Sequence, residues 1–199
     1  TNGIDTESFK QTPALQAAAQ EIRIRYNIRP DELVFSFVGR IVRDKGIQEF
    51  VEAFKHLEQQ FAGKQFRMLL VGPFEQELDP LDQEIYHFLQ TNSKVILAGF
   101  QNDVRPWLLA SDVFVFPSYR EGFPNVVMQA ACLEVCCIVS DINGCNEIIK
   151  HESSGLIVPA KSVAALQAAL TTLVIQPELR RQWAREARAY VSRYYDQYY

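Results

Sequence analysis

The sequence has no long apolar segment. Its longest apolar runs, DVFVFP and CLEVCCIV, have the length of single strands, and charged residues make up 22% of the 199 residues. Because a helix that crosses a bilayer needs about 20 consecutive apolar residues, we predict no membrane-spanning segment. The chain opens TNGIDTESFK, without Met and without an apolar stretch. We therefore expect no signal peptide, and a piece of a longer, cytoplasmic protein.

The sequence also lacks an excess of basic residues and any ordered cysteine pattern. With a formal net charge of −4, a large basic surface is missing, and we expect no nucleic-acid partner. The four cysteines form neither a disulfide framework nor the paired C-x-x-C spacing of a zinc site. We expect small buried thiols in a reducing compartment and no metal site at these positions: Cys132, Cys136, Cys137 and Cys145.

What is present is a regular alternation of strand-like and helix-like segments. The strand-like segments are almost continuously apolar, as in parallel sheets that helices cover on both faces. Strands are predicted at 32–39, 66–72, 94–100, 112–118, 136–141 and 155–159. Helices are predicted at 13–26, 47–61, 81–92, 104–111, from 124 onward, and at 146–151, 163–175 and 177–195, with Thr12 and the Asp79-Pro80 pair as N-terminal caps of the first and third. This alternation predicts an α/β fold, a single Rossmann-like, doubly wound domain of about six parallel strands.

Ligands of such sheets bind beyond the carboxyl ends of the strands, and the first strand ends in the loop VGRIVRDKG, residues 38–46. Arg40 and Lys45 in this loop could meet a phosphate, arginine as a fork and lysine as a point charge. Arg43 competes for this role, and an ordinary basic surface loop is the alternative reading. No G-x-G-x-x-G follows the strand, which disfavours a nicotinamide enzyme.

The fourth strand leads into SYREGFPNVVMQ, residues 118–129. Gly122 allows close approach of the backbone to a ligand, Pro124 suits a first helical turn, and the amides from Asn125 onward would form an anion site. Glu121 is placed to accept hydrogen bonds from sugar hydroxyls, although it could serve the helix dipole alone. Gln129 lies about one helical turn after Asn125. Its side chain could bind hydroxyls, or it could be a surface glutamine.

Two more strand ends carry weaker signals. In AGFQNDV, residues 98–104, a loop with Phe100 could hold a flat base, although a plain turn capped by Asn102 or Asp103 is the alternative. In SDINGCNEII, residues 140–149, Gly144 marks a tight turn.

Together these motifs resemble family-4 glycosyltransferases, which are retaining enzymes of the two-domain GT-B fold. The blocks GRIVRDKG, LVGPF, LAGFQNDVRPWLLASDVFVFPSYREGFPNVVMQAA and SDINGCNEIIKHESSGLIVPA occur in the order typical of that family. The chain resembles the C-terminal, donor-binding half. This resemblance divides the chain into a hinge remnant at 1–12, a nucleotide-sugar-binding domain at 13–178, and a C-terminal helix at 179–199 that would pack back toward an N-terminal half.

The resemblance also implies roles for individual residues. Arg40 and Lys45 match the pair that holds the diphosphate and stabilises the leaving group, and Glu121 matches the first glutamate of the E-x7-E motif, which contacts the donor sugar. Donor contacts are implied for Gly39, Phe100, Gly122, Phe123, Pro124, Asn125, Val126, Val127 and Gln129. The chain departs from the family pattern where the second glutamate is Gln129, where VGxG is VGPF, and where a common proline is Cys137. The glutamine raises the alternative of a degenerate, non-catalytic nucleotide-sugar-binding module.

The expected reaction is sugar transfer from a nucleotide-sugar to a sugar or lipid-linked acceptor held by the other half. No D-x-D pair follows a strand, so we expect a metal-independent reaction in which two cations and a helix N-terminus stabilise the diphosphate. The isolated chain is expected to turn over little, and membrane contact, peripheral to the inner face, is expected only through the other half. A nucleotide-sugar epimerase fits less well, because its motifs lack the EGFPN turn.

Overall fold

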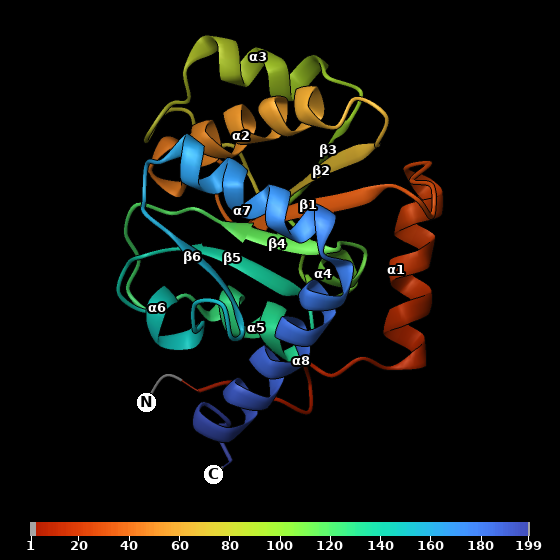
Figure 1. Cartoon of the computed structure of the whole chain (residues 1–199), viewed down its shortest axis with the longest axis vertical. Helices are drawn as coiled ribbons and strands as arrows, with labels where there is room; N and C mark the ends of the chain where they lie inside the picture. Colours follow the sequence, from red (N-terminus) through yellow and green to blue (C-terminus); the bar gives the residue numbers. More distant parts are fainter. Residues whose placement is uncertain (1–2, 199) are drawn as a thin grey trace.

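The computed structural model describes residues 3–198 and contains one six-stranded sheet (Figure 1). All strand pairs are parallel, in the order β3-β2-β1-β4-β5-β6. The strands are β1 (Leu33–Val38), β2 (Phe66–Val71), β3 (Val95–Gly99), β4 (Val113–Phe116), β5 (Cys136–Ser140) and β6 (Gly155–Val158). The strand order reverses between β1 and β4, and an open α/β sheet forms its binding crevice at such a point.

Helices cover both faces of the sheet. They are α1 (Pro13–Arg25), α2 (Ile47–Gln60), α3 (Gln83–Thr91), α4 (Arg105–Leu109), α5 (Asn125–Cys132), α6 (Cys145–Ile148), α7 (Val163–Ile175) and α8 (Pro177–Tyr194), with a short 3₁₀ turn η1 (Arg43–Lys45) before α2. In Figure 1, α7 lies along α2, and α1 stands apart on the side of α4. The predicted doubly wound α/β domain is confirmed.

Alternate residues of β1 enter two separate cores. Phe35 and Phe37 pack with α2 in the larger cluster, whereas Val34 packs with α1 and α4 in the smaller one. Successive side chains of a strand point to opposite faces, so a strand that is buried on both faces is mostly apolar, and the buried Ser36 hydroxyl of β1 is paired with the Ser111 hydroxyl at 2.8 Å. The predicted apolar face of α2, which includes Ile47 and Phe50, is fully buried.

Local signals at the helix ends were correct in one case and wrong in another. Thr12 caps α1, and its hydroxyl accepts a hydrogen bond from the Leu15 amide at 3.2 Å. The prediction that Asp79 and Pro80 cap the third helix is wrong, because α3 begins only at Gln83. The Asp79 carboxylate instead accepts a hydrogen bond from the Asp44 amide, at 2.6 Å, in the loop after β1. A capping residue competes with any other backbone amide that the fold brings to it.

The two ends of the described chain run side by side. The Ile4 amide donates to the Tyr195 carbonyl at 2.8 Å, and the Gln197 amide donates to the Ile4 carbonyl at 3.1 Å. The Thr6 hydroxyl also donates to the Asp196 carboxylate. Of the predicted hinge remnant, residues 1 and 2 lie outside the described residues. Within residues 3–198, no helix combines the length and the apolar character needed to cross a bilayer.

The last helix starts at Pro177, as predicted, so the expected domain boundary at 179 falls inside this helix. Its inward face, with Trp183, Ala184, Ala187 and Val191, is buried in the larger core cluster and packs on α5, β5 and β6. The helix therefore closes this domain. A further contact of α8 with another domain stays a prediction.

Candidate active site

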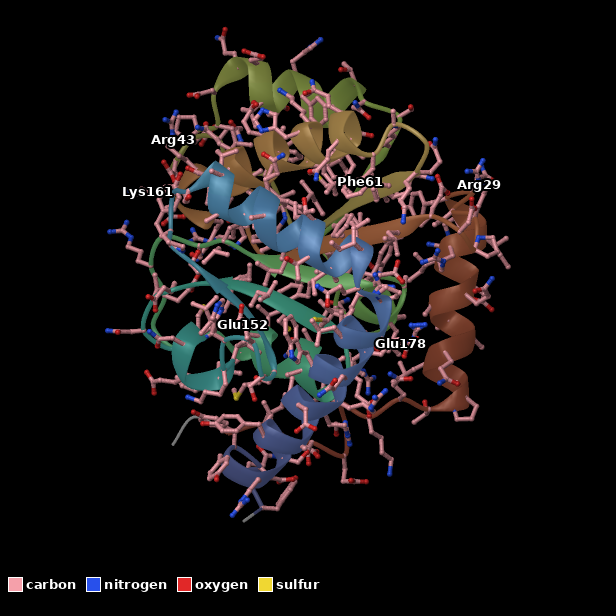
Figure 2. The ribbon with its side chains drawn as sticks, viewed as in Figure 1. Arg29, Arg43, Phe61, Glu152, Lys161 and Glu178 are labelled. Atoms are coloured by element: carbon pink, nitrogen blue, oxygen red, sulfur yellow. The ribbon has the colours of Figure 1, made fainter. Side chains whose placement is uncertain are left out.

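Two loops meet at the carboxyl ends of β1 and β4. The Tyr119 amide donates a hydrogen bond to the Asp44 carbonyl at 2.8 Å. Gly46 adopts a left-handed φ of 72°, and a side chain there would lie 2.0 Å from the Pro117 carbonyl oxygen. The loop after β1 and the loop after β4 are therefore held in direct contact. Figure 2 shows this rim on the left of the molecule, where Arg43 and Lys161 are labelled.

Lys45 and Glu121 form an ion pair across the two loops. The Lys45 Nζ lies 2.5 Å from the Glu121 Oε1, and the two side chains are only 13% and 17% exposed. The buried Ser118 hydroxyl donates to the same Oε1 at 2.7 Å. Among residues 3–198, the other oxygen, Oε2, accepts no hydrogen bond from the protein. Glu121 is thus anchored through one oxygen, and its second oxygen remains available to a ligand.

Arg40 lies at the same rim but pairs with a different loop. Its Nη1 donates to the Glu75 Oε2 at 3.0 Å. The Glu75 carboxylate raises the pKa of Arg40, and the carboxylates of Asp44 and Glu121 raise this pKa further by their charge. Arg40 is therefore a permanent cation, and the charge of Glu121 acts on it. Its side chain is half-exposed, and Glu75 occupies only part of its guanidinium.

Arg43, the competing cation, points elsewhere. Its guanidinium donates to the Asp82 carboxylate at 2.7 Å and to the Pro80 carbonyl at 3.1 Å, both before α3. It also lines a surface cavity of about 350 Å³ with Asp44, Asp79, Tyr119, Arg120 and Lys161. Lys45, rather than Arg43, therefore pairs with Glu121 of the loop after β4.

Helix α5 begins directly after the EGFP turn. Pro124 occupies the N-cap position and not the first helical turn that the sequence analysis predicted. The Val127 amide donates to the Pro124 carbonyl at 3.0 Å, but for the Asn125 and Val126 amides the described part of the chain supplies no acceptor. Such unsatisfied amides are typical of a helix N-terminus and form a site for an anion. Asn125 is exposed and Val126 is half-buried, so the site is open to solvent.

The turn before α5 rests on the loop after β5. Gly144 has a φ of 82°, and a Cβ there would lie 2.6 Å from the Gly122 carbonyl oxygen and 2.7 Å from the Pro124 Cδ. The Gly144 amide donates to the Glu147 Oε1 at 3.1 Å. The weak turn signal of Gly144 therefore marks a contact that positions the backbone at residues 122–124.

The remaining predicted residues lie around this rim. Gly39 follows β1, and its amide donates to the Val71 carbonyl at 2.9 Å. Phe100 follows β3 and is 72% exposed. In the same loop, Asp103 accepts a hydrogen bond from the Arg105 amide at 3.0 Å, but the N-cap of α4 is Val104, so neither Asn102 nor Asp103 is its N-cap residue. Gln129 is half-buried on α5.

The four thiols are buried, as the sequence indicated. Burial raises the pKa of Cys145 to about 12, and the charge of Glu121 raises it while that of Lys45 lowers it. Cys145 is therefore a small buried residue near enough to the ion pair to be affected by both charges. Within residues 3–198, no group of three or more His, Cys, Asp and Glu side chains could hold a metal. Metal independence stays a prediction, because nucleotide phosphates can bring their own cation.

Sequence reasoning missed three residues of the site: Ser118, Glu75 and Asp79. Glu75 and Asp79 form hydrogen bonds to residues on another loop, Arg40 and Asp44 respectively, whereas Ser118 donates to Glu121 within its own loop. Motif spacing does not indicate contacts between loops that lie 35 residues apart. For Ser118 the position three residues before Glu121 was the available signal, because a short hydroxyl can bond locally.

The family model for glycosyl transferases group 1 matches residues 18–190. The chain belongs to this family. The capsular polysaccharide biosynthesis glycosyltransferase CapM of Staphylococcus aureus is 32% identical over 181 residues, which are 90% of this chain and 45% of CapM. An Escherichia coli UDP-Gal:alpha-D-GlcNAc-diphosphoundecaprenol alpha-1,3-galactosyltransferase is 31% identical over 169 residues, which are 85% of this chain and 43% of that protein. This group 1 glycosyltransferase chain spans less than half the length of these relatives.

Solved structures support the fold of the glycosyltransferase chain. Anabaena HepE in complex with UDP has a TM-score of 0.83 at 20% identity, with 98% of this chain and 52% of HepE covered. The C-terminal domain of a group 1 glycosyltransferase (LpcC) from Francisella tularensis has a TM-score of 0.82 at 24% identity, with 98% of this chain and 100% of that chain covered. At these identities the likeness concerns the fold alone.

Proposed function

We propose that this chain is the donor-binding half of a retaining, metal-independent glycosyltransferase that uses a nucleotide-sugar. The observation that carries the proposal is the Lys45–Glu121 ion pair at 2.5 Å, at a rim that also holds Arg40 and the open N-terminus of α5. These groups suit a diphosphate linked to a sugar. The cations and the unsatisfied amides can bind the diphosphate, and the carboxylate with one free oxygen can bind the sugar.

The donor is proposed to be a uridine diphosphate sugar. HepE, which shares the fold, was solved with UDP and with UDP-glucose, and the galactosyltransferase relative is named for UDP-Gal. Phe100, which is exposed at the end of β3, is proposed to line the pocket for the base. Gln129 is proposed to bind the ribose hydroxyls through its amide.

In the proposed reaction the bond between the anomeric carbon and the diphosphate oxygen breaks, and the diphosphate leaves with the electron pair. The acceptor hydroxyl oxygen bonds to the anomeric carbon on the same face, and its proton passes to the departing diphosphate oxygen. Arg40, Lys45 and the amides of Asn125 and Val126 stabilise the negative charge that develops on the diphosphate. Glu121 accepts hydrogen bonds from the donor sugar and orients it.

The relatives also favour a saccharide on a lipid diphosphate as the acceptor. The galactosyltransferase is named for a diphosphoundecaprenol-linked acceptor, as is an N-acetylgalactosaminyltransferase of Campylobacter jejuni that is 30% identical over 155 residues. The proposed place of this acceptor, and of any contact with the inner face of the membrane, is an N-terminal half that precedes residue 3.

A thermal-shift panel tests the donor proposal. Uridine, guanosine and adenosine diphosphates are compared, together with their glucose conjugates. At about 100 times its Kd, a ligand adds about 2.7 kcal/mol of stability, which is on the order of 5–10 °C in Tm for a domain of this size. Only the uridine ligands are expected to give this shift, and Lys45→Ala is expected to abolish most of it. No shift with any nucleotide would contradict the proposal.

A second candidate, a non-catalytic nucleotide-sugar-binding module, is favoured by Gln129 in the place of the second motif glutamate. The two candidates differ in the full-length protein. If Gln129→Glu raises transfer activity by about tenfold or more, corresponding to about 1.4 kcal/mol, the native protein is a degenerate binder. An unchanged or lowered activity supports an enzyme that uses glutamine.

A further inference from the structure

Tyr195 lies between the EGFP turn and the paired ends of the chain. It follows α8 as the C-cap residue. Its ring centroid is 5.5 Å from that of Phe123, at an interplanar angle of 46°, so the two rings are in van der Waals contact. Phe123 stands directly before the N-cap Pro124 of α5. The side chain of Tyr195 therefore forms one wall for the turn that ends at the anion site.

The hydroxyl of Tyr195 reaches the same turn by a second route. It donates to the Glu147 carbonyl at 3.2 Å, and the Glu147 carboxylate accepts a hydrogen bond from the Gly144 amide at 3.1 Å. Gly144 in turn supports the Gly122 carbonyl and Pro124, with no room for a Cβ between them. One side chain thus touches the turn directly and also fixes the loop on which the turn rests.

The backbone of Tyr195 belongs to the strip that joins the chain ends. Its carbonyl accepts from the Ile4 amide at 2.8 Å, and the next residue, Asp196, forms a parallel bridge with Ile4. Thr6 donates its hydroxyl to the Asp196 carboxylate. Ile4 and Thr6 are both buried. A displacement of this strip would move Tyr195, and with it the wall behind Phe123.

We propose that Tyr195 is a positioning residue that couples the strip formed by residues 4–6 and 195–197 to the donor-binding turn. It holds residues 122–124 so that the Asn125 and Val126 amides face the diphosphate. The inference rests on the proposed function, because it assigns the turn a diphosphate ligand. It adds that this strip sets the affinity for the donor, so that a displacement of the paired chain ends is felt at the phosphates.

Three variants test the coupling. Tyr195→Leu removes the ring contact and the hydroxyl, Tyr195→Phe keeps the ring, and Val191→Ala opens a cavity at a fully buried position one turn earlier in α8. The first readout is amide hydrogen exchange of residues 120–127 without ligand. We expect exchange about tenfold faster in Tyr195→Leu, close to wild type in Tyr195→Phe, and unchanged in this segment for Val191→Ala despite its lower Tm.

The second readout is UDP affinity by calorimetry. Tyr195→Leu is expected to weaken UDP binding by about tenfold or more, because a misplaced binding group loses much of its effect. Tyr195→Phe is expected to stay within about threefold of wild type, and Val191→Ala to bind as wild type does. Thr6→Ala, which loosens the strip without touching the turn, is expected to weaken binding in the same direction by a smaller factor.

The two readouts separate the possible failures. If exchange of residues 120–127 in Tyr195→Leu matches that of Val191→Ala, the coupling does not exist, whatever the affinities. The coupling is also overturned if Tyr195→Leu binds UDP as tightly as wild type. If the exchange rises as expected but wild type binds no nucleotide in calorimetry, the proposed function has failed and the positioning role fails with it.

Discussion

The two carboxylate oxygens of Glu121 have different roles, one toward the protein and one toward the proposed ligand. Oε1 accepts from Lys45 and Ser118, and this holds the side chain in one orientation. Oε2 accepts no hydrogen bond within residues 3–198 and is the atom that we assign to the sugar hydroxyls. The ammonium of Lys45 has three donors, of which Glu121 uses one. The same pair can therefore bind a sugar and a phosphate without first breaking apart.

Replacement of Glu121 by glutamine separates the two roles. The expected result is a loss of about tenfold in affinity for UDP-glucose, in line with the 1.5–3 kcal/mol of a hydrogen bond to a charged group. Affinity for UDP alone should be unchanged or higher, because a negative charge next to the diphosphate is removed. Calorimetry with both ligands gives the ratio. An equal loss for UDP and UDP-glucose would show that Glu121 does not contact the sugar.

At the residue scale, the burial of the four thiols determines how stability depends on pH and how fast the thiols react. Burial raises the pKa of Cys132, Cys136 and Cys145 to about 12 and raises that of Cys137 as well. Because the folded pKa values exceed those of an unfolded chain, the thiols contribute stability below about pH 9, and this contribution is lost as pH rises toward 12.

At pH 8 the native chain should react with a thiol reagent only slowly, and the denatured chain should react at four thiols. Rapid reaction of the native chain would contradict the buried placement.

At the scale of elements, the rim depends on glycines that let loops touch. Gly144→Ala introduces a Cβ 2.6 Å from the Gly122 carbonyl oxygen at a positive φ. We expect a loss of about 1–3 kcal/mol of stability and a weaker affinity for UDP, because residues 122–124 must move. Gly63→Ala is the matched control, since a Cβ there meets nothing within 4 Å. Equal UDP affinities of the two variants would show that Gly144 does not position the turn.

The elements were predictable from the sequence because their signals are local. Continuous apolar runs such as Leu33–Val38 reported strands buried on both faces, and Thr12 reported the start of α1. The pairing of loops was not predictable in the same way. Asp79 was expected at a helix cap but binds the Asp44 amide, and the partner of Arg40 is Glu75. These choices depend on which loops the sheet order brings together.

At the scale of the whole molecule, residues 3–198 form one α/β domain, and cations, carboxylates and amides converge at the rim where the loops after β1 and β4 meet. Helix α8 buries its inner face in this domain, and residues 4–6 pair with residues 195–197 beside the donor-binding turn. The domain matches one whole chain among its structural relatives and about half of others. In the proposed function, donor binding belongs to this domain and sugar transfer to the longer protein.

The 199-residue chain is accordingly expected to bind UDP-glucose but to transfer no sugar. The acceptor side of the cleft lies outside this domain in the proposed function, so the reacting hydroxyl is not positioned. Incubation of the chain with radiolabelled UDP-glucose and lipid-linked saccharides measures the transfer, with the full-length protein as the control. Detectable transfer by the chain alone would contradict the division of roles.

The most direct test of the central claim is an NMR titration of the ¹⁵N-labelled chain with UDP. The diphosphate is proposed to bind between Lys45 and the first turn of α5. The amides of Asn125 and Val126 should therefore show the largest shifts, while those of Lys64 and Gln65, near the start of β2, should not move. Unmoved signals at 125 and 126, with saturable shifts elsewhere, would contradict the account.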